Sequence, residues 1–293
     1  MSQNLNPQQH AALKYIDGPL LVLAGAGSGK TSVITRKIAY LVEECGIPAR
    51  NIAAVTFTNK AAREMKARVS ALLGKSEGRG LTVSTFHNLG LTIIRTEIKA
   101  LGFKPGFSIL DQEDCKNLLK ELLVRNTELD EKLIDTAQNT ISNWKNGLLE
   151  PHQTANASNS TGEQGIAMLY ERYQRALKAY NAVDFDDLIM TPVLLFRSQP
   201  EILAKWQRRI RYLLVDEYQD TNLAQYELVK TLVNEKQALT VVGDDDQSIY
   251  AWRGARPENL MQLQEDFPSL NIIKLEQNYR STGRILKAAN TLI

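Results

Sequence analysis

A glycine-rich segment with one lysine and one threonine is a clear candidate for chemistry. It reads Ala24-Gly25-Ala26-Gly27-Ser28-Gly29-Lys30-Thr31, after the apolar run Leu20 to Leu23 and before a helical stretch. Glycines let a backbone wrap around phosphates, which N–H donors and the positive end of a helix dipole then hold. The order of strand, loop and helix indicates a P-loop with Ala24 in the place of the first glycine. We expect Lys30 to neutralise the β and γ phosphates and Thr31 to bind Mg²⁺; the alternative is a glycine-rich turn with an incidental lysine.

Two adjacent carboxylates, Asp216 and Glu217, follow the apolar run Tyr212 to Val215. Ligands of open α/β sheets bind at the carboxyl ends of the strands. Asp216 suits a Mg²⁺ site, and Glu217 suits the orientation and deprotonation of a water that attacks the γ-phosphate. Acidic residues also cap strands without any chemistry, but a P-loop in the same chain favours the catalytic interpretation.

A third apolar run, Leu239 to Gly243, also leads into polar residues. Gln247 is long enough to touch a γ-phosphate, whereas Tyr250, Trp252 and Arg253 could offer flat faces to unstacked bases. The alternative is an acidic turn before an aromatic core cluster. Beyond a last run, Ile272 to Leu275, Arg280 could reach the γ-phosphate as an arginine finger.

The elements that must position these residues are short strands and helices in alternation. Continuous apolar runs predict strands buried on both faces, and their alternation with helices predicts a parallel α/β sheet. The six expected strands are Leu20 to Ala24, Ile52 to Phe57, Leu81 to Ser84, Tyr212 to Val215, Leu239 to Gly243 and Ile272 to Leu275.

Between Phe86 and Arg211 the strand runs stop, which predicts a helical insertion into the α/β domain. We expect its polar segment Pro151 to Gly165 to be a flexible surface loop. The chain ends within an apparent helix, Thr282 to Ile293, without a C-cap signal, so we expect it to be cut there. The helices expected in the insertion are Asp111 to Arg125, Glu131 to Trp144, Glu163 to Tyr180 and Phe185 to Phe196.

Composition indicates an ordinary soluble protein of about two domains. The 293 residues are 43% hydrophobic and 23% charged, and no apolar run reaches the ~20 residues of a membrane span. No secretory signal or disulfide framework is visible, so we expect a reducing cytosol. The net charge of +2 is uneven, because residues 1–104 hold 14 basic and 6 acidic side chains. This front third either binds a polyanion or carries solvated lysines.

Seven motifs, taken in order, resemble superfamily 1A DNA helicases of the Rep, PcrA and UvrD group. They are LAGAGSGKT, VTFTNKAAREM, STFHNLG, DFDDLI, LLVDEYQDTN, VVGDDDQSIYAWRGA and LEQNYRS, and the resemblance covers essentially the whole chain. It implies an α/β, RecA-like P-loop parallel sheet flanked by helices, with an inserted all-helical domain. Residues 1–86 and 197–278 would form the motor domain, 87–196 the insertion, and 279–293 the start of a second RecA-like domain.

The resemblance also implies ATP and Mg²⁺ as cofactors. Gln9, in a segment that looks like the adenine-reading Q motif, would contact the adenine, and Tyr279 would stack on it. Lys30, Thr31 and Asp216 keep the roles given above, Glu217 would be the base, and Gln247 and Arg280 would sense the γ-phosphate. Family members commonly carry Arg after the P-loop threonine, where this chain has Ser32.

The implied partners are single-stranded DNA, junctions of single and double strands, and replication or repair proteins, without a membrane. The implied location is the bacterial cytoplasm, at the nucleoid. On the DNA side the matching residues are Phe57, Asn59, Lys60, Thr85, His87, Tyr250, Trp252 and Arg253.

Several alternatives stay open at this stage. Phe57 could be a core residue, and Asp184, Asp186 and Asp187, although they match a family motif, suit helix capping and structural pairing better than chemistry. His87 suits a hydrogen bond better than a zinc site. The function is either an ATP-dependent 3′ to 5′ translocase or helicase, or a fragment that binds nucleotide and single strands weakly without unwinding. A P-loop kinase or GTPase fits less well, because no Asn-Lys-x-Asp guanine reader is present.

Overall fold

The computed structural model describes residues 5–25, 27–123, 131–157, 160–244 and 258–284. The chain divides into two compact units. We call residues 1–85, 203–221 and 229–293 the α/β unit, and residues 86–202 and 222–228 the inserted unit. These bounds come from the packing of the chain, and the assignment of the units to the domains of a helicase stays a prediction.

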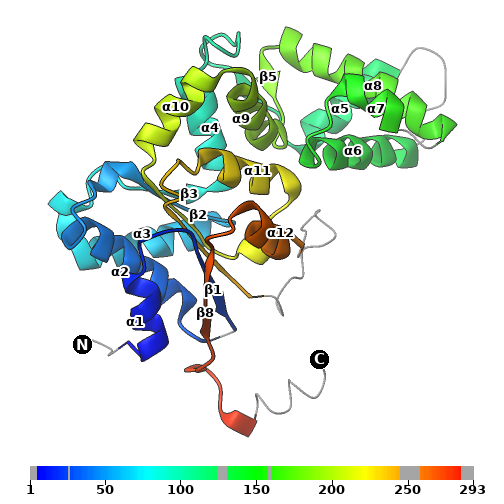
Figure 1. Ribbon diagram of the computed structural model, residues 1–293. Helices are drawn as coiled ribbons and strands as arrows, with labels where there is room; N and C mark the ends of the chain where they lie inside the picture. The colour runs from blue at the N-terminus through cyan, green and yellow to red at the C-terminus, as the bar shows by residue number, and fades with distance from the viewer. Residues whose placement is uncertain (1–4, 26, 124–130, 158–159, 245–257, 285–293) are drawn as a thin grey trace. The chain divides into compact units, whose positions relative to one another are not determined.

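The α/β unit contains a six-stranded parallel sheet with strand order β3-β2-β6-β7-β1-β8, drawn in Figure 1. The predicted parallel α/β sheet is confirmed, and the six predicted strands differ from the observed ones only at their ends. The strands are β1 (Leu20–Ala24), β2 (Ile52–Thr56), β3 (Thr82–Thr85), β6 (Tyr212–Val215), β7 (Leu239–Gly243) and β8 (Asn271–Leu275).

Helices cover this sheet and bury its apolar side chains. Helices α1, α2 and α3 pack beside one another (Figure 1). Helix α12 packs against the short helix η2. Leu20, Val22, Ile38 and Leu214 are buried in the resulting core. The elements are α1 (Pro7–Lys14), α2 (Lys30–Glu43), η1 (Ala49–Asn51), α3 (Asn59–Glu77), η2 (Tyr218–Asp220) and α12 (Glu258–Asp266). Two more helices, α10 (Pro200–Arg209) and α11 (Leu223–Leu232), have residues in both units.

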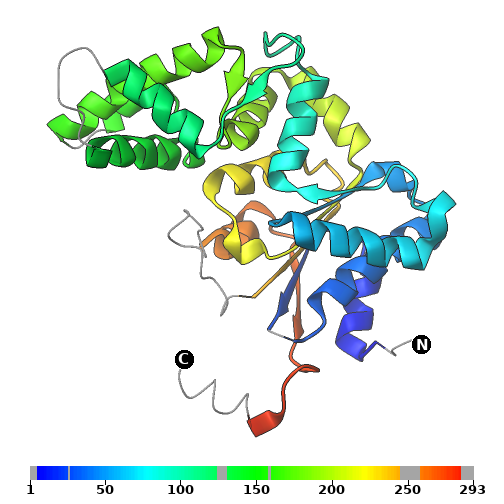
Figure 2. The same cartoon turned by 180° about the vertical axis from the view of Figure 1, so that it is seen from behind.

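The inserted unit is mainly helical, and α5 to α8 form the bundle drawn in green in Figure 2. The structure adds a parallel pair of strands, β4 (Ser108–Ile109) and β5 (Ala182–Val183), to the all-helical insertion that was predicted. Two-residue strands are too short to show a periodic pattern in the sequence. The helices are α4 (Phe86–Thr96), α5 (Gln112–Leu123), α6 (Glu131–Asn146), α7 (Pro151–Ala157), α8 (Thr161–Ala179) and α9 (Asp187–Ser198).

The predicted loop from Pro151 to Gly165 is wrong in its described part. Residues 151–157 form α7, and α8 begins at Thr161. Pro151 occupies the first helical position, where its missing N–H is not needed, and Ser160 caps α8 by accepting a hydrogen bond from the Glu163 N–H. The Ser-x-x-Glu spacing at 160–163 is a capping signal that polar composition alone conceals.

A lysine inside the inserted unit is wholly buried between carboxylates. Lys145 Nζ lies 2.7 Å from Asp184 Oδ2 and 2.8 Å from Asp187 Oδ1. Burial opposes the ammonium, but the facing carboxylates raise the pKa of Lys145 above its usual value. The Asp187 N–H also donates to Asp184 Oδ1, and the Asp184 N–H to Asp187 Oδ2. The structural pairing expected for this motif is confirmed, whereas Asp186, the N-cap residue of α9, makes no capping hydrogen bond with its side chain.

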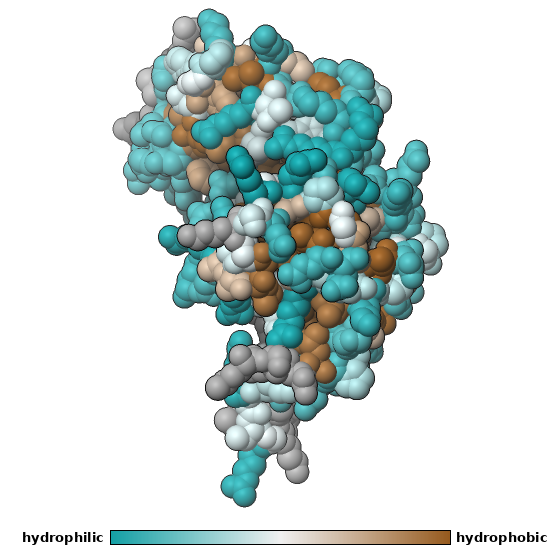
Figure 3. All heavy atoms as spheres, turned by 90° about the vertical axis from the view of Figure 1, so that its left-hand side faces the viewer, coloured by the Kyte–Doolittle hydropathy of each residue, from teal (hydrophilic) through white to brown (hydrophobic). Residues whose placement is uncertain are grey.

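The surface carries both hydrophobic and hydrophilic side chains. On the face in Figure 3, hydrophobic patches alternate with hydrophilic residues. No described helix is both long and apolar enough to cross a membrane. The predicted helix from 282 to 293 lies mostly outside the described residues, which end at Arg284.

Candidate nucleotide site and DNA-contacting residues

The P-loop follows directly from β1, as predicted. Ala24 ends the strand, and the Ser28 N–H and Oγ both donate to the Gly25 carbonyl, at 3.2 and 2.7 Å. Gly29 has a φ of +91°, in the left-handed region that glycine tolerates best, and α2 begins at Lys30. The chain thus wraps tightly before a helix N-terminus, the arrangement that binds phosphate. Ala26 lies outside the described residues.

Lys30 lies between two carboxylates at the carboxyl ends of neighbouring strands. Its Nζ is 3.4 Å from Glu217 Oε2 and 3.6 Å from Asp244 Oδ2, and its side chain is 10% exposed. The strand order β6-β7-β1 explains the cluster, because it brings the ends of three adjacent strands together. Sequence reasoning identified Lys30 and Glu217 but not Asp244, whose place at the end of β7 was a usable signal.

Asp216 and Glu217 differ sharply in their surroundings. Asp216 is buried at the end of β6, and burial, together with the charge of Glu217, raises its pKa to about 7. Glu217 is half exposed and has a φ of +52°, an uncommon conformation for a residue with a side chain. A buried carboxylate with a raised pKa suits a bound cation, whose charge would offset the burial. The reacting water would instead meet the more accessible Glu217.

A Mg²⁺ ion fits the donors that are present. The described residues contain no group of three His, Cys, Asp or Glu side chains able to hold a metal by themselves. Mg²⁺ usually takes one or two protein oxygens and completes its shell with water and substrate phosphates. Asp216 and the Thr31 hydroxyl provide that kind of partial site.

Gln219 links the candidate base to the next strand. Its Nε2 donates to Glu217 Oε2 at 2.9 Å, and its Oε1 accepts from the Asp244 N–H at 3.0 Å. The side chain is 2% exposed. Sequence reasoning missed Gln219, because its partners come from two strand ends and no spacing rule connects them.

The residues predicted to contact the base adjoin the P-loop. Gln9 is buried, and its Nε2 donates to the Ser28 carbonyl at 3.0 Å. The Tyr279 N–H donates to the Gly27 carbonyl at 2.9 Å. A Cβ atom at Gly27 would lie 2.5 Å from the Cβ of Arg280, so this close approach requires glycine. The structure therefore brings Gln9, Tyr279 and Arg280 to the same loop.

Predicted DNA contacts in the α/β unit lie at two neighbouring strand ends. Strands β2 and β3 pair in parallel with Thr56 opposite Thr85, so Phe57 leaves the sheet beside the buried Thr85. Phe57 is half-buried, while Asn59 and Lys60 are exposed in the first turn of α3, which Thr58 caps. These residues occupy the same edge of the sheet as the P-loop.

His87 belongs to the inserted unit, in the first turn of α4. Its ring centroid is 5.6 Å from that of Phe185, which is 54% exposed, and burial lowers the pKa of His87. A neutral imidazole at physiological pH is a hydrogen-bonding group rather than a fixed cation. Sequence reasoning missed Phe185, although an aromatic between aspartates in a matched motif was a signal.

Besides Ala26, four further predicted residues lie outside the described part of the chain. They are Gln247, Tyr250, Trp252 and Arg253.

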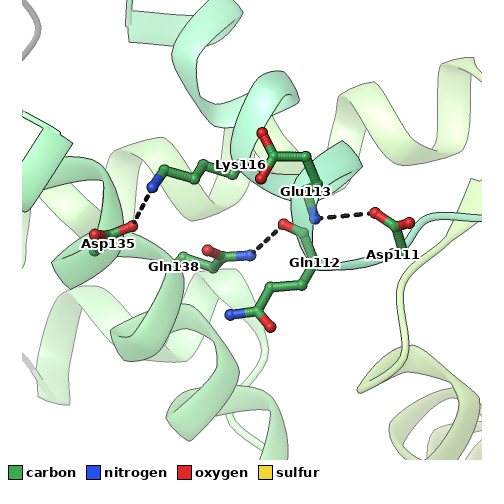
Figure 4. A pocket seen from close by; sticks show the side chains of 6 residues that line it. All are labelled: Asp111, Gln112, Glu113, Lys116, Asp135 and Gln138. Carbon is green, nitrogen blue, oxygen red and sulfur yellow. Dashed lines mark hydrogen bonds and ion pairs between the residues drawn. The ribbon is translucent and has the colours of Figure 1, made fainter.

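A cavity of about 430 Å³ in the inserted unit is not part of this site. Six side chains line it, and most of them already interact with one another: the Lys116 ammonium lies 2.8 Å from Asp135, and Gln138 donates to the Gln112 carbonyl (Figure 4). None of the residues predicted to bind nucleotide or DNA lines it.

Comparison with known proteins agrees with the motifs. The family model described as the UvrD/REP helicase N-terminal domain matches residues 5–268. The chain is 60% identical over 289 residues to the ATP-dependent DNA helicase Rep of Escherichia coli, which covers 99% of this chain and 43% of that protein. It is 49% identical over 291 residues to the ATP-dependent DNA helicase PcrA of Bacillus subtilis, covering 99% of this chain and 39% of that protein. The chain thus spans about two-fifths of the length of these relatives, and it belongs to the UvrD/REP helicase family.

Proposed function

We propose that this chain is the ATP-binding part of an ATP-dependent 3′ to 5′ translocase or helicase that acts in replication or repair. The observation that carries the proposal is the cluster of Lys30, Glu217 and Asp244 beside a P-loop that Gln9 and Tyr279 also approach. The names of the relatives support ATP as the fuel and DNA as the substrate. The direction of movement is taken from the family resemblance.

In the proposed reaction, ATP binds with its β and γ phosphates against the loop 24–31. Lys30 exchanges its contacts with carboxylates for contacts with phosphate oxygens, which are also negatively charged. Thr31 and Asp216 hold Mg²⁺, which neutralises phosphate charge when bound. Glu217 orients the attacking water and accepts its proton, while Gln247 and Arg280 contact the γ-phosphate.

Single-stranded DNA would cross the edge of the sheet where β2 and β3 end. Phe57, Tyr250 and Trp252 would stack on bases, and Lys60 and Arg253 would contact phosphates. Asn59, Thr85 and His87 would add hydrogen bonds, and the exposed Phe185 beside His87 offers a further flat face. The exposed cations near Asn59 agree with the basic front third of the sequence.

The second candidate is a chain that binds nucleotide and single strands but turns over slowly. It is favoured by the length comparison, because more than half of each relative has no counterpart in these 293 residues. ATP in the family lies between two RecA-like domains, and an arginine finger from the second domain raises the rate of hydrolysis by roughly 10³ to 10⁵. Replication or repair partners and a location at the bacterial nucleoid are further parts of the proposal that rest on the family.

The deciding experiment measures ATP hydrolysis by the 293-residue chain with and without a single-stranded oligonucleotide. Glu217→Gln is the matched control, because the amide fills the same space but cannot accept a proton. Slow hydrolysis that this variant abolishes supports a motor that has only one of the two ATP-binding domains. Robust hydrolysis that single strands stimulate supports a motor that needs no second domain. Hydrolysis that persists in Glu217→Gln would contradict the assigned base.

DNA binding is tested separately by fluorescence anisotropy with a labelled oligonucleotide. Phe57→Ala should weaken binding by about 1 to 3 kcal/mol with little base preference, as the loss of a stacking face would. Lys60→Ala should lower the dependence of affinity on salt by about one phosphate contact. If Phe57→Ala lowered only the melting temperature, Phe57 would be a core residue.

A further inference from the structure

The turn that begins α1 joins two residues that the proposed ATP site assigns to the base. Asn6 Oδ1 accepts a hydrogen bond from the Gln9 N–H at 2.7 Å, and the Asn6 N–H donates to Gln9 Oε1 at 3.1 Å. Asn6 Nδ2 donates to Tyr279 Oη at 2.9 Å, across 273 positions of sequence. A single side chain therefore contacts both the predicted adenine reader and the predicted stacking ring.

The partners of Gln9 fix which way its amide points. Its Oε1 faces the N–H of Asn6, and its Nε2 faces the carbonyl of Ser28, so each end meets a group of the opposite kind. An amide offers two lone pairs and two hydrogens, which leaves one of each unused by these two bonds. Adenine presents a donor at N6 and an acceptor at N7, whereas guanine presents acceptors at both O6 and N7. The remaining lone pair and hydrogen match adenine and leave guanine with a repulsive contact.

Tyr279 is anchored at both ends while its ring stays accessible. Its backbone N–H donates to the Gly27 carbonyl, and its hydroxyl accepts from Asn6 and donates to Gln277 Oε1 at 2.9 Å. The residue is nevertheless 55% exposed. A ring held in this way can stack on any base, because every base has a flat face.

We infer that Asn6 is a positioning residue that determines how this site distinguishes its nucleotide. Its Oδ1 fixes the backbone of Gln9, so that the Asn6 N–H meets the Gln9 amide, which selects adenine over guanine. Its Nδ2 sets the Tyr279 ring, which holds either base. The inference rests on the proposed function, and it deepens it. The two contacts control different quantities: the amide controls the ratio of ATP to GTP affinity, and the ring controls both affinities together.

The experiment measures equilibrium binding of ATP and GTP to the 293-residue chain, each by displacement of a fluorescent nucleoside triphosphate. Asn6→Ser keeps a side-chain oxygen that can cap α1 but is too short to reach Tyr279. We expect it to weaken ATP and GTP binding alike, about threefold, and to leave their ratio unchanged. Asn6→Ala keeps the backbone N–H that faces Gln9 Oε1 but removes both side-chain hydrogen bonds, including the cap that fixes this turn. We expect it to lower the ratio about fivefold as well, because the turn that places Gln9 is no longer held.

Ser160→Ala is the matched control, because it removes the cap of α8 in the inserted unit through the same kind of hydrogen bond. It should lower thermal stability as Asn6→Ala does, without a change in the ratio. Gln9→Ala separates this inference from the proposed site. If Gln9→Ala abolishes the preference for ATP and Asn6→Ala leaves it intact, the role of Asn6 is wrong and the ATP site stands. If the wild type has no preference for ATP, or Gln9→Ala does not change it, the assignment of Gln9 fails and the role of Asn6 fails with it.

Discussion

Two lysines in this molecule each lie between two carboxylates, and their surroundings differ. Lys145 is fully buried, with Asp184 and Asp187 at 2.7 and 2.8 Å. Lys30 is 10% exposed, with Glu217 and Asp244 at 3.4 and 3.6 Å. The first cluster is closed by short contacts, whereas the contacts of the second are long enough for an anion to replace them.

Each cluster consists of one lysine and two carboxylates, and the difference shows how such a set can either stabilise a fold or be available to a ligand. In the inserted unit, Tyr173 and Gln174 donate further hydrogen bonds to the two aspartates, so the carboxylates are well satisfied. At the P-loop, Glu217 is 38% exposed. Removing one partner from a short, buried ion pair costs much stability. In the longer contacts beside the phosphate-binding loop, a phosphate can replace a carboxylate as the partner of the lysine.

The largest expected effect is the loss of stability on removal of Lys145. Lys145→Met leaves two buried carboxylates without their cation, and we expect a loss of about 3 to 5 kcal/mol in the free energy of unfolding. Lys30→Met should cost less, about 1 to 3 kcal/mol, because its contacts are longer and Glu217 is partly solvated, although Asp244 is buried. Urea denaturation of both variants checks the comparison.

A compensating variant guards against the case in which Lys145→Met does not fold. Lys145→Met combined with Asp184→Asn and Asp187→Asn removes all three charges and should recover much of the lost stability. Equal losses for Lys30→Met and Lys145→Met would show that the two clusters do not differ in the way described.

The second effect concerns pH, and here two buried carboxylates, Asp216 and Asp184, respond in opposite directions. The pKa of Asp216 rises from 3.8 to about 7 in the folded chain, so the folded state holds this proton more tightly. Stability from this group is therefore full below pH 3.8 and is lost as the pH rises through about 7, by about 4 kcal/mol. The ammonium of Lys145 lowers the pKa of Asp184 despite its burial, so that stability is lost as the pH falls.

The measurement is urea denaturation of the wild type and Asp216→Asn between pH 4 and 8, in EDTA without nucleotide. The difference in unfolding free energy between the two proteins isolates Asp216 from the other carboxylates. We expect Asp216→Asn to gain relative stability as the pH rises. A difference that stays constant over this range would show that Asp216 ionises normally in the folded chain.

Much of the α/β unit could be predicted because its signals are local. The four inner strands, β1, β2, β6 and β7, are mainly apolar and buried, whereas the edge strands β3 and β8 are partly polar. A P-loop needs glycines, one lysine and one hydroxyl close together in the sequence. The helix from 151 to 157 was missed, because a proline at the first helical position looks like a loop signal when the neighbouring residues are polar. Local motifs can thus be recognised in the sequence, but polar composition alone gives the wrong secondary structure where a capping residue begins a helix.

The residues that orient the site could not be predicted, because their partners are distant in the sequence. Asn6 meets Tyr279, and Gln219 meets Asp244, only after the sheet has ordered its strands. No spacing rule connects such pairs. Local motifs therefore located the reacting groups, and the tertiary structure was needed to find what holds them.

The third expected effect is on nucleotide affinity. Lys30→Ala removes the ammonium of the loop, and the lost charge-assisted contacts to phosphate should weaken ATP binding about 100-fold. Lys145→Met, where it folds, should leave ATP binding unchanged, since its cluster belongs to the inserted unit. Isothermal titration with ATP and Mg²⁺ checks both variants. Equal ATP affinity in the wild type and Lys30→Ala would overturn the assignment of the loop.

The smallest expected effect separates two glutamines, the buried Gln219 and the half-buried Gln174, that each donate to a carboxylate of one cluster. Gln219 Nε2 donates to Glu217 at 2.9 Å, and Gln174 Nε2 donates to Asp187 at 3.2 Å. Methionine has a similar shape and no amide, so Gln219→Met and Gln174→Met should each cost about 1 kcal/mol of stability. Only Gln219→Met should also slow hydrolysis of bound ATP, about tenfold, because Glu217 loses the group that orients it toward the water. Single-turnover hydrolysis of saturating labelled ATP measures this step without interference from binding. Slower hydrolysis in both variants would mean that a general loss of stability, and not the orientation of Glu217, explains the effect.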